Sequence, residues 1–366
     1  MILETINSPA DVKRLSEEDT ARLCQELRQF LVEQVSRTGG HLASNLGVVE
    51  LTVAIHRVYD TASDRLVLDV GHQCYVHKAL TGRRALFDTL RQFGGLSGFP
   101  KPYESVHDAF MAGHASDSVS VALGMARART LLGADYQVAA VIGDGALGGG
   151  LSFEGLNDAG GSGEPLVVIL NDNGMSIDKN VGGLSRHLSR MRTEPEYYAF
   201  KKKYRKALEK LPAGRTLYEW SHELKTALKK SLLPPVSTVF EDMGFSYMGP
   251  ADGHDVQRLT AVLQAAREAG RPVLVHVHTV KGSGYEPALH GVGAFDPATG
   301  QVRQTAQEAF SHVFGETLRQ LARQDGRVCA ITAAMADGTG LTGFAGEFPR
   351  RFFDVGIAEG HGVAMA

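Results

Sequence analysis

The segment Val138–Ile177 has the pattern of a strand, a glycine turn, a helix, a second strand and a polar turn. Its first apolar run, Val138–Ile142, stops at Gly143-Asp144-Gly145, and its second, Leu166–Leu170, ends at Asn171-Asp172-Asn173. Two short apolar runs joined through a helix are typical of a βαβ unit in a buried parallel sheet. The segment therefore predicts an α/β fold with a doubly wound, mostly parallel sheet and helices on both faces. The strands are expected near 65–70, 137–142, 166–171, 245–248 and 272–280.

Polar side chains follow both strands of this unit. Asp144 and Asn173 each stand one step past a predicted strand end, so they would share the carboxyl edge of the sheet, where α/β proteins bind ligands. Carboxylate, carboxamide and backbone carbonyl oxygens suit a Mg²⁺ ion that also takes oxygens from a di- or triphosphate. Asp, Asn and Gly are equally common in ordinary βα turns, and the asparagine at the second strand end is what favours a metal–phosphate site.

Composition indicates a globular protein of one large domain and part of another. The 366 residues are 43% apolar and 22% charged with a net charge of −3, which argues against nucleic-acid or membrane partners. The three cysteines form no CxxC pair, so we expect no disulfide framework and a reducing, cytoplasmic location. No apolar run reaches membrane-spanning length, and Met1–Ala10 contains no signal-peptide core.

The chain is expected to divide into a first domain, 1–290, a Pro/Gly-textured linker, 291–304, and a second segment, 305–366. A basic helical insertion is predicted at about 184–235 within the first domain. The last segment holds two predicted strands, too few for an α/β domain of usual size. We therefore expect it to be the incomplete start of a second α/β domain in a truncated chain.

Two further patterns are interpreted as structural. The charge run Lys201–Lys206 is interrupted by an aromatic residue, but a solvated helix face is favoured over a nucleic-acid patch because the overall charge balance is acidic. His276 and His278 lie two apart in a predicted strand. Because no third ligand is evident nearby, buried structural histidines are favoured over a zinc site.

Three histidines stand in turns next to predicted element ends. His41 lies in a turn before a helix, His72 follows the strand at 65–70, and His114 precedes a helix beginning after Ser116-Asp117. From the residues alone, a surface position is favoured for His41, and His72 is as compatible with a structural role as with a site. The amides around His114 would form an anion site at a helix N-terminus, and a cap by Ser116 or Asp117 is compatible with it.

The spacing of GDG and NDN resembles the thiamine diphosphate motif of transketolase-like enzymes. Other segments resemble the 1-deoxy-D-xylulose-5-phosphate synthase family in particular, over Gly39 to Ala366. These segments are GHLASNLGVVEL at Gly40–Leu51, DVGHQ at Asp69–Gln73, LRQFGGLSGFP at Leu90–Pro100, GDGAL at Gly143–Leu147, DGHD at Asp252–Asp255 and GYEP at Gly284–Pro287. The resemblance implies a diphosphate-binding domain, followed by the start of a pyrimidine-binding domain.

The resemblance also implies thiamine diphosphate and Mg²⁺ as cofactors and assigns residues to them. Asp144, Asn173 and the Met175 carbonyl would hold the metal. The residues implied to bind the cofactor are His72, Gly113, His114, Ala115, Gly145, Ala146, Asn173, Tyr285 and Glu359. The catalytic residues implied are His41, His72 and Glu359, with the Glu359 carboxylate hydrogen-bonded to the aminopyrimidine ring. Taken alone, Glu359 is equally an ordinary helix-start residue.

The implied reaction is transfer of a two-carbon unit from pyruvate, with decarboxylation, to D-glyceraldehyde 3-phosphate. It would yield 1-deoxy-D-xylulose 5-phosphate and CO₂, the first step of non-mevalonate isoprenoid synthesis and a feed to thiamine and pyridoxal. A homodimer is implied as well. Two alternatives stay open: a transketolase or other thiamine enzyme, and a catalytically silent cofactor-binding fragment. We expect little or no turnover from these 366 residues alone.

The chain departs from the pattern that the resembled family usually shows. Gly148 and Gly174 stand where that family has Thr and Glu, and Gly360 and Gly362 stand where it has Gln and Ala. Because Gly174 adjoins Asn173, its backbone freedom is expected to loosen the metal site.

Overall fold

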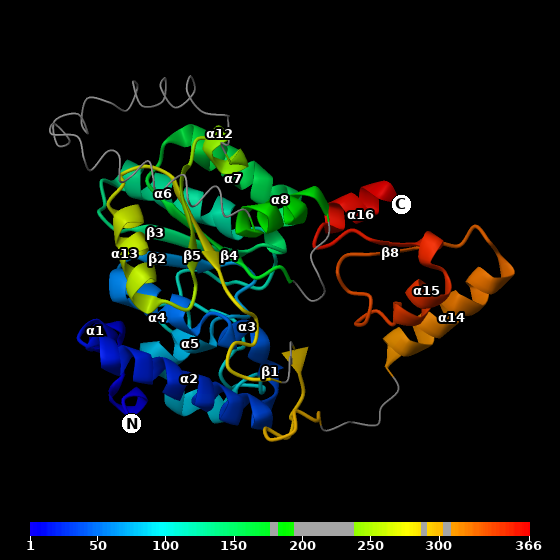
Figure 1. Ribbon diagram of the computed structural model, residues 1–366, viewed down its shortest axis with the longest axis horizontal. Helices are drawn as coiled ribbons and strands as arrows, with labels where there is room; N and C mark the ends of the chain where they lie inside the picture. Colours follow the sequence, from blue (N-terminus) through cyan, green and yellow to red (C-terminus); the bar gives the residue numbers. More distant parts are fainter. Residues whose placement is uncertain (176–181, 194–237, 287–290, 303–308) are drawn as a thin grey trace.

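The computed structural model describes residues 1–175, 182–193, 238–286, 291–302 and 309–366. A main body built on one sheet is followed in the chain by a smaller unit (Figure 1). Of the predicted basic insertion, 184–235, the structure describes only the start, in helix α8 (Gly182–Thr193). The charge run Lys201–Lys206 lies outside the described residues.

Five parallel strands form the main sheet, in the order β2-β3-β4-β6-β5. All five predicted strands are present, with ends shifted by a few residues. They are β2 (Arg65–Leu68), β3 (Val138–Gly143), β4 (Val167–Asp172), β5 (Ser246–Asp252) and β6 (Val273–His278). The prediction of a parallel α/β sheet is therefore confirmed.

Helices cover both faces of this sheet, because alternate strand residues are apolar on each side. Val138 and Ala140 of β3 join the core beneath α6 and α7, whereas Ala139 and Val141 join the core that includes α2 and α4. Over the part of the chain that the structure describes, the α-helices of the main body besides α8 are α1 (Pro9–Lys13), α2 (Glu17–Thr38), α3 (Leu42–Leu46), α4 (Val49–Val58), α5 (Tyr75–Lys78), α6 (Ser118–Leu132), α7 (Gly150–Ser162), α12 (Val239–Asp242) and α13 (Val256–Arg267). The sheet is doubly wound, as predicted (Figure 1).

The winding reverses beside β4. Helices α6 and α7, which connect β2 to β3 and β3 to β4, pack on one face, and α13, which connects β5 to β6, packs on the other. The chain leaves β4 towards α8 on the first face, whereas after β6 the Gly282 amide bonds to Ala43 of α3 on the second. Such a reversal opens a crevice at the carboxyl edge of a parallel sheet. Asp144 and Asn173 follow strands at this position.

The two histidines of β6 differ in environment. His276 is fully buried, with Nε2 2.9 Å from Asp172 Oδ2 and Nδ1 2.7 Å from Tyr247 Oη. The prediction of a buried structural histidine is confirmed for His276. For His278 it is wrong, because this side chain is exposed at the end of the strand.

The predicted linker, 291–304, is packed against the main body over its described part. Strand β7 (Gly291–Val292) pairs antiparallel with β1 (Gly40–His41), and Phe295 is completely buried in the main core. A simple linker would not be expected to bury a large apolar side chain, yet Phe295 lies in the core although the segment is rich in Gly and Pro. These residues therefore help to build the first domain.

The smaller unit contains α14 (Phe310–Gln324), β8 (Ala330–Thr332), α15 (Thr342–Glu347), β9 (Phe352–Asp354) and α16 (Glu359–Met365). Strands β8 and β9 form a parallel pair over a small core around Phe344. Helix α14 begins at Phe310, and residues 303–308, which include the expected start of the second segment, lie outside the described part. Several apolar residues of α14 are exposed, including Phe310 and Phe314.

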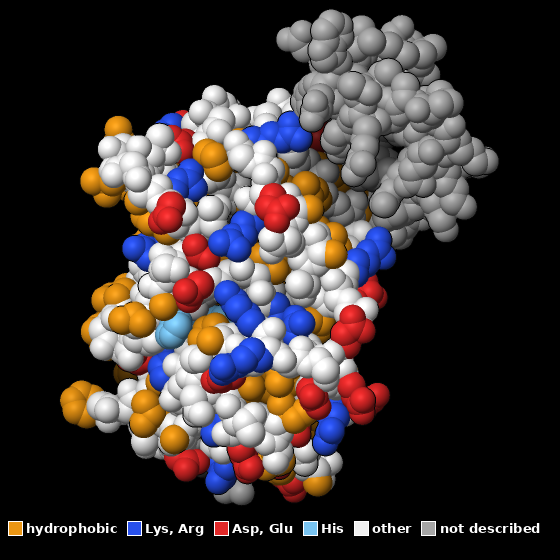
Figure 2. Space-filling view, turned by 90° about the vertical axis from the view of Figure 1, so that its left-hand side faces the viewer, with side chains coloured by type: hydrophobic (Ala, Val, Ile, Leu, Met, Phe, Trp, Pro, Cys, Tyr) orange, Lys and Arg blue, Asp and Glu red, His pale blue; other side chains and the backbone are white. Residues whose placement is uncertain are grey.

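The distribution of surface charge and the state of the cysteines are those expected from the composition. On the face shown in Figure 2, basic and acidic side chains are interspersed, as a net charge of −3 leads one to expect. Cys24 and Cys74 are buried and Cys329 is exposed, and all three are free thiols. Among the described residues, no helix combines the length and apolar character that crossing a bilayer requires.

Candidate functional site

The turns that follow β3 and β4 meet at the carboxyl edge of the sheet. Asp144, 7% exposed, accepts hydrogen bonds from the Gly145 amide on Oδ1 (3.0 Å) and from the Gly174 amide on Oδ2 (2.7 Å). Asn173 Oδ1 accepts a hydrogen bond from the Met175 amide at 3.0 Å. The carboxylate and the carboxamide predicted from the sequence therefore belong to two turns that are bonded to each other.

The loop that follows β2 joins the same edge through Asp69. Its carboxylate accepts hydrogen bonds from the Ser116 amide (2.9 Å) and the Ser118 amide (3.1 Å), and so caps α6. Of the two caps that the sequence suggested, Asp117 occupies the N-cap position of α6 but makes no side-chain cap hydrogen bond, and the side-chain acceptor comes instead from the distant strand end. Burial raises the pKa of Asp69, against the effect of these amides.

The segment Gly113–Ser116 is held between two turns of the site. The Val70 amide donates to the His114 carbonyl (3.1 Å), and the Ser116 hydroxyl donates to the Ala146 carbonyl (2.7 Å). His114 is exposed, and its Nδ1 lies 2.7 Å from the Ala115 carbonyl, an arrangement that puts a proton on Nδ1. The predicted cofactor residues 113–115 and 145–146 are thus part of one connected arrangement.

His41 and His72 are neighbours, with ring centroids 5.3 Å apart. Asn45, which is fully buried, holds both of them: its Nδ2 donates to the His41 carbonyl (2.7 Å) and the His72 carbonyl (2.8 Å). Its Oδ1 accepts the Tyr75 amide at 2.8 Å. Asn45 was not predicted as a site residue, although its carboxamide stands out within a largely apolar helix start.

The electrostatic surroundings keep His41 neutral. Burial, followed by the nearby charges of Arg91 and Lys281, lowers the pKa of His41 to about 4. At neutral pH this imidazole accepts a hydrogen bond or a proton more readily than it carries charge. Lys281, in the turn after β6, thus adds a cation near His41 that the sequence did not predict.

The carboxyl edge of the sheet has open space beside three glycines and backbone strain at two other residues, and both features are common at binding sites. A Cβ atom added at Gly113, Gly143 or Gly148 would meet no atom within 4 Å. Val70 and Ser116 adopt positive φ angles of 58° and 77°, which residues with a Cβ rarely do and which cluster at functional sites.

The donor set is compatible with a Mg²⁺–diphosphate group. Asp144 and Asn173 supply hard oxygens, and Gly113 and Gly143 leave space in which backbone could approach phosphate. Among the described residues, no three His, Cys, Asp or Glu side chains are grouped as a metal site. The predicted Mg²⁺ ligands differ from such a cluster, because they are one carboxylate, one carboxamide and the Met175 backbone carbonyl.

Two predicted residues lie apart from this arrangement. Tyr285 donates its hydroxyl to the Pro297 carbonyl (3.0 Å) and lies beside Phe295, with ring centroids 6.3 Å apart. Glu359 is exposed at the first position of α16, in the smaller unit. Its role at the pyrimidine ring stays a prediction.

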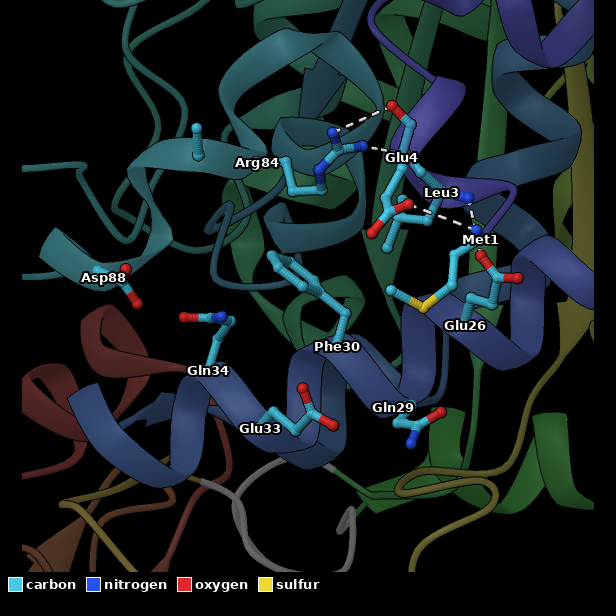
Figure 3. Close-up of a pocket in the computed structure, with 11 residues that line it drawn as sticks. Met1, Leu3, Glu4, Glu26, Gln29, Phe30, Glu33, Gln34, Arg84 and Asp88 are labelled. Atoms are coloured by element: carbon cyan, nitrogen blue, oxygen red, sulfur yellow. Dashed lines mark hydrogen bonds and ion pairs between the residues drawn. The ribbon is translucent and has the colours of Figure 1, made fainter.

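The cavity in Figure 3 is a separate feature. It measures about 350 Å³ and lies between the N-terminal residues, α2 and the segment Arg84–Thr89. Glu26 and Glu33 contribute acidic side chains to its lining, and Arg84 is bound to the Leu3 carbonyl. The residues predicted as site residues do not line it.

Comparisons with known proteins agree on the family. A family model described as 1-deoxy-D-xylulose-5-phosphate synthase matches residues 3–279, and one described as the transketolase pyrimidine-binding domain matches residues 306–366. The 1-deoxy-D-xylulose-5-phosphate synthase of Natranaerobius thermophilus is 53% identical over all of this chain and 59% of its own length. That of Clostridium kluyveri is 51% identical over the same shares. The chain thus spans about three fifths of the length of these curated relatives.

Solved structures show the same fold at low identity. Transketolase from Leishmania mexicana matches 91% of this chain and 48% of its own with a TM-score of 0.56 and 18% identity. Transketolase from Campylobacter jejuni matches 74% and 39% with a TM-score of 0.52 and 18% identity. These likenesses support the α/β architecture alone.

Proposed function

The chain belongs to the 1-deoxy-D-xylulose-5-phosphate synthase family, and on that premise we propose that it carries the diphosphate-binding part of a thiamine diphosphate enzyme. The complete enzyme would condense pyruvate with D-glyceraldehyde 3-phosphate, releasing CO₂ and forming 1-deoxy-D-xylulose 5-phosphate. The observation that carries the proposal is the hydrogen bond from Gly174 to Asp144, which joins the two turns bearing the predicted metal ligands.

The cofactor would supply a thiazolium carbon that becomes nucleophilic once deprotonated, with Mg²⁺ neutralising its diphosphate. Asp144, Asn173 and the Met175 carbonyl would hold the metal. The turns at Gly113–Ala115 and Gly145–Ala146 would surround the diphosphate, and Tyr285 would pack against the cofactor. The open space beside Gly113 and Gly143 supports this assignment.

The chain's histidines would act on the substrate. His41 is neutral at pH 7, so it can accept a hydrogen bond or a proton from a substrate hydroxyl. His72 lies beside it and would contact cofactor and substrate, in a position fixed by Asn45. Glu359 would hydrogen-bond to the pyrimidine ring, which requires α16 or its copy in a homodimer to approach the site.

The wider role follows from the proposed reaction. The product would feed isoprenoid precursor synthesis and, by further steps, thiamine and pyridoxal, and we place the enzyme in the cytoplasm. Two other proposals are a transketolase-type activity and a silent cofactor-binding fragment. A turnover assay with pyruvate, and separately with ketose donors, distinguishes the three, and we expect little or no turnover from these 366 residues alone.

Calorimetric titration with thiamine diphosphate and Mg²⁺ tests the site. We expect Mg²⁺-dependent binding by the parent chain and at least about tenfold weaker binding by Asp144→Ala and Asn173→Ala, since side chains that touch the metal balance its charge and set its geometry. Asp158→Ala, which changes an exposed aspartate of α7 paired with Arg127, is the matched control. Equal affinity of the Asp144→Ala variant and the parent would place the metal elsewhere.

A further inference from the structure

A partly buried cluster of Arg28, Glu50 and His254 lies beside the candidate site and is shared by three elements. Arg28 of α2 forms two hydrogen bonds to Glu50 of α4, at 2.5 and 2.6 Å. His254, in the turn between β5 and α13, brings its Nδ1 within 3.0 Å of Glu50 Oε2. Burial alone would raise the pKa of Glu50, but the hydrogen bonds from His254 and Arg28 hold it at about 2. Glu50 is therefore a carboxylate.

The same cluster holds the loop that follows β6. The Val280 amide donates to His254 Nε2 at 2.9 Å, and Arg28 Nε donates to the Ser283 carbonyl at 3.1 Å. Between them, the Gly282 amide donates to the Ala43 carbonyl at 2.9 Å. The Val280–Tyr285 loop is thus bonded at three successive points.

The hydrogen bonds of His254 fix its protonation state. Because the Val280 amide can only donate, Nε2 of His254 must accept, and the single ring proton resides on Nδ1, facing Glu50. His254 therefore bridges a carboxylate and a loop amide as a neutral imidazole. A side chain that only donates cannot replace it.

We propose that Arg28, Glu50 and His254 are positioning residues, which hold the Val280–Tyr285 loop against α3 and thereby keep Lys281 close to His41. The proposal deepens the proposed function and rests on it, because the loop borders the same sheet edge. Close packing supports it: a Cβ at Gly47 would lie 3.3 Å from Lys281 Cα, and a Cβ at Gly284 would lie 3.0 Å from Arg28 Cδ.

We call the cluster of Arg28, Glu50 and His254, together with its contacts to the Val280–Tyr285 loop, the clamp. Amide hydrogen exchange on the whole chain, without cofactor, tests directly whether the clamp holds the loop. In His254→Ala we expect exchange at Val280 and Gly282 to become about three- to tenfold faster, the change that follows from losing one net hydrogen bond. His254→Gln carries both an NH₂ donor group and a carbonyl acceptor, so it should restore the slower exchange. Unchanged exchange in His254→Ala overturns the proposal.

A matched control separates the clamp from general loss of stability. Glu164→Gln weakens the partly buried Arg129–Glu164 pair, whose atoms lie 3.4 Å apart and which belongs to α6 and the segment before β4. It should leave the exchange of Val280 unchanged, and equal acceleration in this control would also overturn the proposal. If His254→Ala does not fold, Arg28→Lys replaces it as the test variant. Arg28→Lys keeps the positive charge opposite Glu50 but loses the Nε donor to the Ser283 carbonyl, so faster exchange in the loop is expected there too and unchanged exchange overturns the proposal.

Two further readouts connect the clamp to the site. The pKa of His41, followed by NMR, should rise in His254→Ala because Lys281 is no longer held nearby, and should be unchanged in Glu164→Gln. Affinity for thiamine diphosphate with Mg²⁺ should fall several-fold in the first variant alone. If the parent chain binds no cofactor, the proposed function fails, whereas the exchange and titration results still decide the clamp.

Discussion

The Gly174 amide donates a 2.7 Å hydrogen bond to Asp144 Oδ2, so the turn after β4 orients the carboxylate after β3. Gly174 achieves this with a φ angle of +74°, a conformation that glycine adopts without steric cost. The sequence led us to expect that this glycine loosens the metal site. In the structure the same amide also donates to Asp172 Oδ1 at 3.3 Å, so it links the turns after β3 and β4, and the effect of Gly174 on metal binding stays a prediction.

Gly174→Ala tests this relationship. A Cβ at φ +74° costs about 1–2 kcal/mol in the left-handed region, so we expect lower stability together with weaker Mg²⁺-dependent cofactor binding. Denaturant unfolding and calorimetry measure the two effects. Gly148→Ala is the control, because a Cβ there meets open space and φ is not positive; its unfolding free energy should stay close to that of the parent. A fully stable Gly174→Ala variant would contradict the expectation.

Three histidines whose pKa values are lowered in the folded chain, His41, His56 and His77, predict sensitivity of the protein's stability to acid. The pKa of His41 is lowered to about 4 in the folded chain from the ordinary 6.5, so the unfolded chain binds more protons between these values. Stability should therefore rise with pH across this window and be lost as pH falls from about 6.5 towards about 4. Burial lowers the pKa of His56 and His77 too, which adds to the same trend.

Removing the His41 titration should flatten this dependence. We expect His41→Gln to lose less unfolding free energy than the parent between about pH 7.5 and about pH 5. Denaturant unfolding at both pH values provides the measurement, and an NMR titration of His41 gives its pKa independently. Identical pH slopes in parent and variant would show that His41 titrates normally.

A completely buried lysine organises the loop that reaches His41. Lys78 Nζ lies 2.5 Å from Glu104 Oε2, and Glu104 Oε1 accepts the Ser97 amide at 2.8 Å. Two residues further on, the Phe99 ring lies 6.1 Å from the His41 ring. The ion pair therefore fixes a loop that forms part of the wall around His41.

Breaking this pair on one side should cost more than replacing both partners. Glu104→Gln leaves Lys78 buried without a countercharge, for which we expect a loss of about 3–5 kcal/mol. The double change of Glu104→Gln with Lys78→Met removes that charge, so it should lose less than the single change. Urea unfolding of the two variants gives the comparison. A double variant less stable than Glu104→Gln alone would refute this account.

The local parts of the site could be predicted from the sequence, and its long-range parts could not. Asp144 and Asn173 were found because apolar runs mark the strand ends that precede them. Asp69, by contrast, caps a helix 47 residues away in sequence, and His254 contacts Glu50 across 204 residues. Such contacts leave no periodic pattern, because they depend on which strand ends become neighbours once the sheet has formed.

Two adjacent glycines of α7 should respond oppositely to alanine. A Cβ at Gly160 would lie 2.0 Å from the Met243 carbonyl oxygen, so Gly160→Ala must push α7 away from the segment before β5, and we expect a loss of about 1–3 kcal/mol. At Gly161 a Cβ meets nothing within 4 Å, so Gly161→Ala should gain about 0.5–1 kcal/mol from helix propensity. Thermal and denaturant unfolding give both signs. Equal effects at the two positions would mean that α7 does not approach Met243 this closely, because propensity alone treats the two glycines alike.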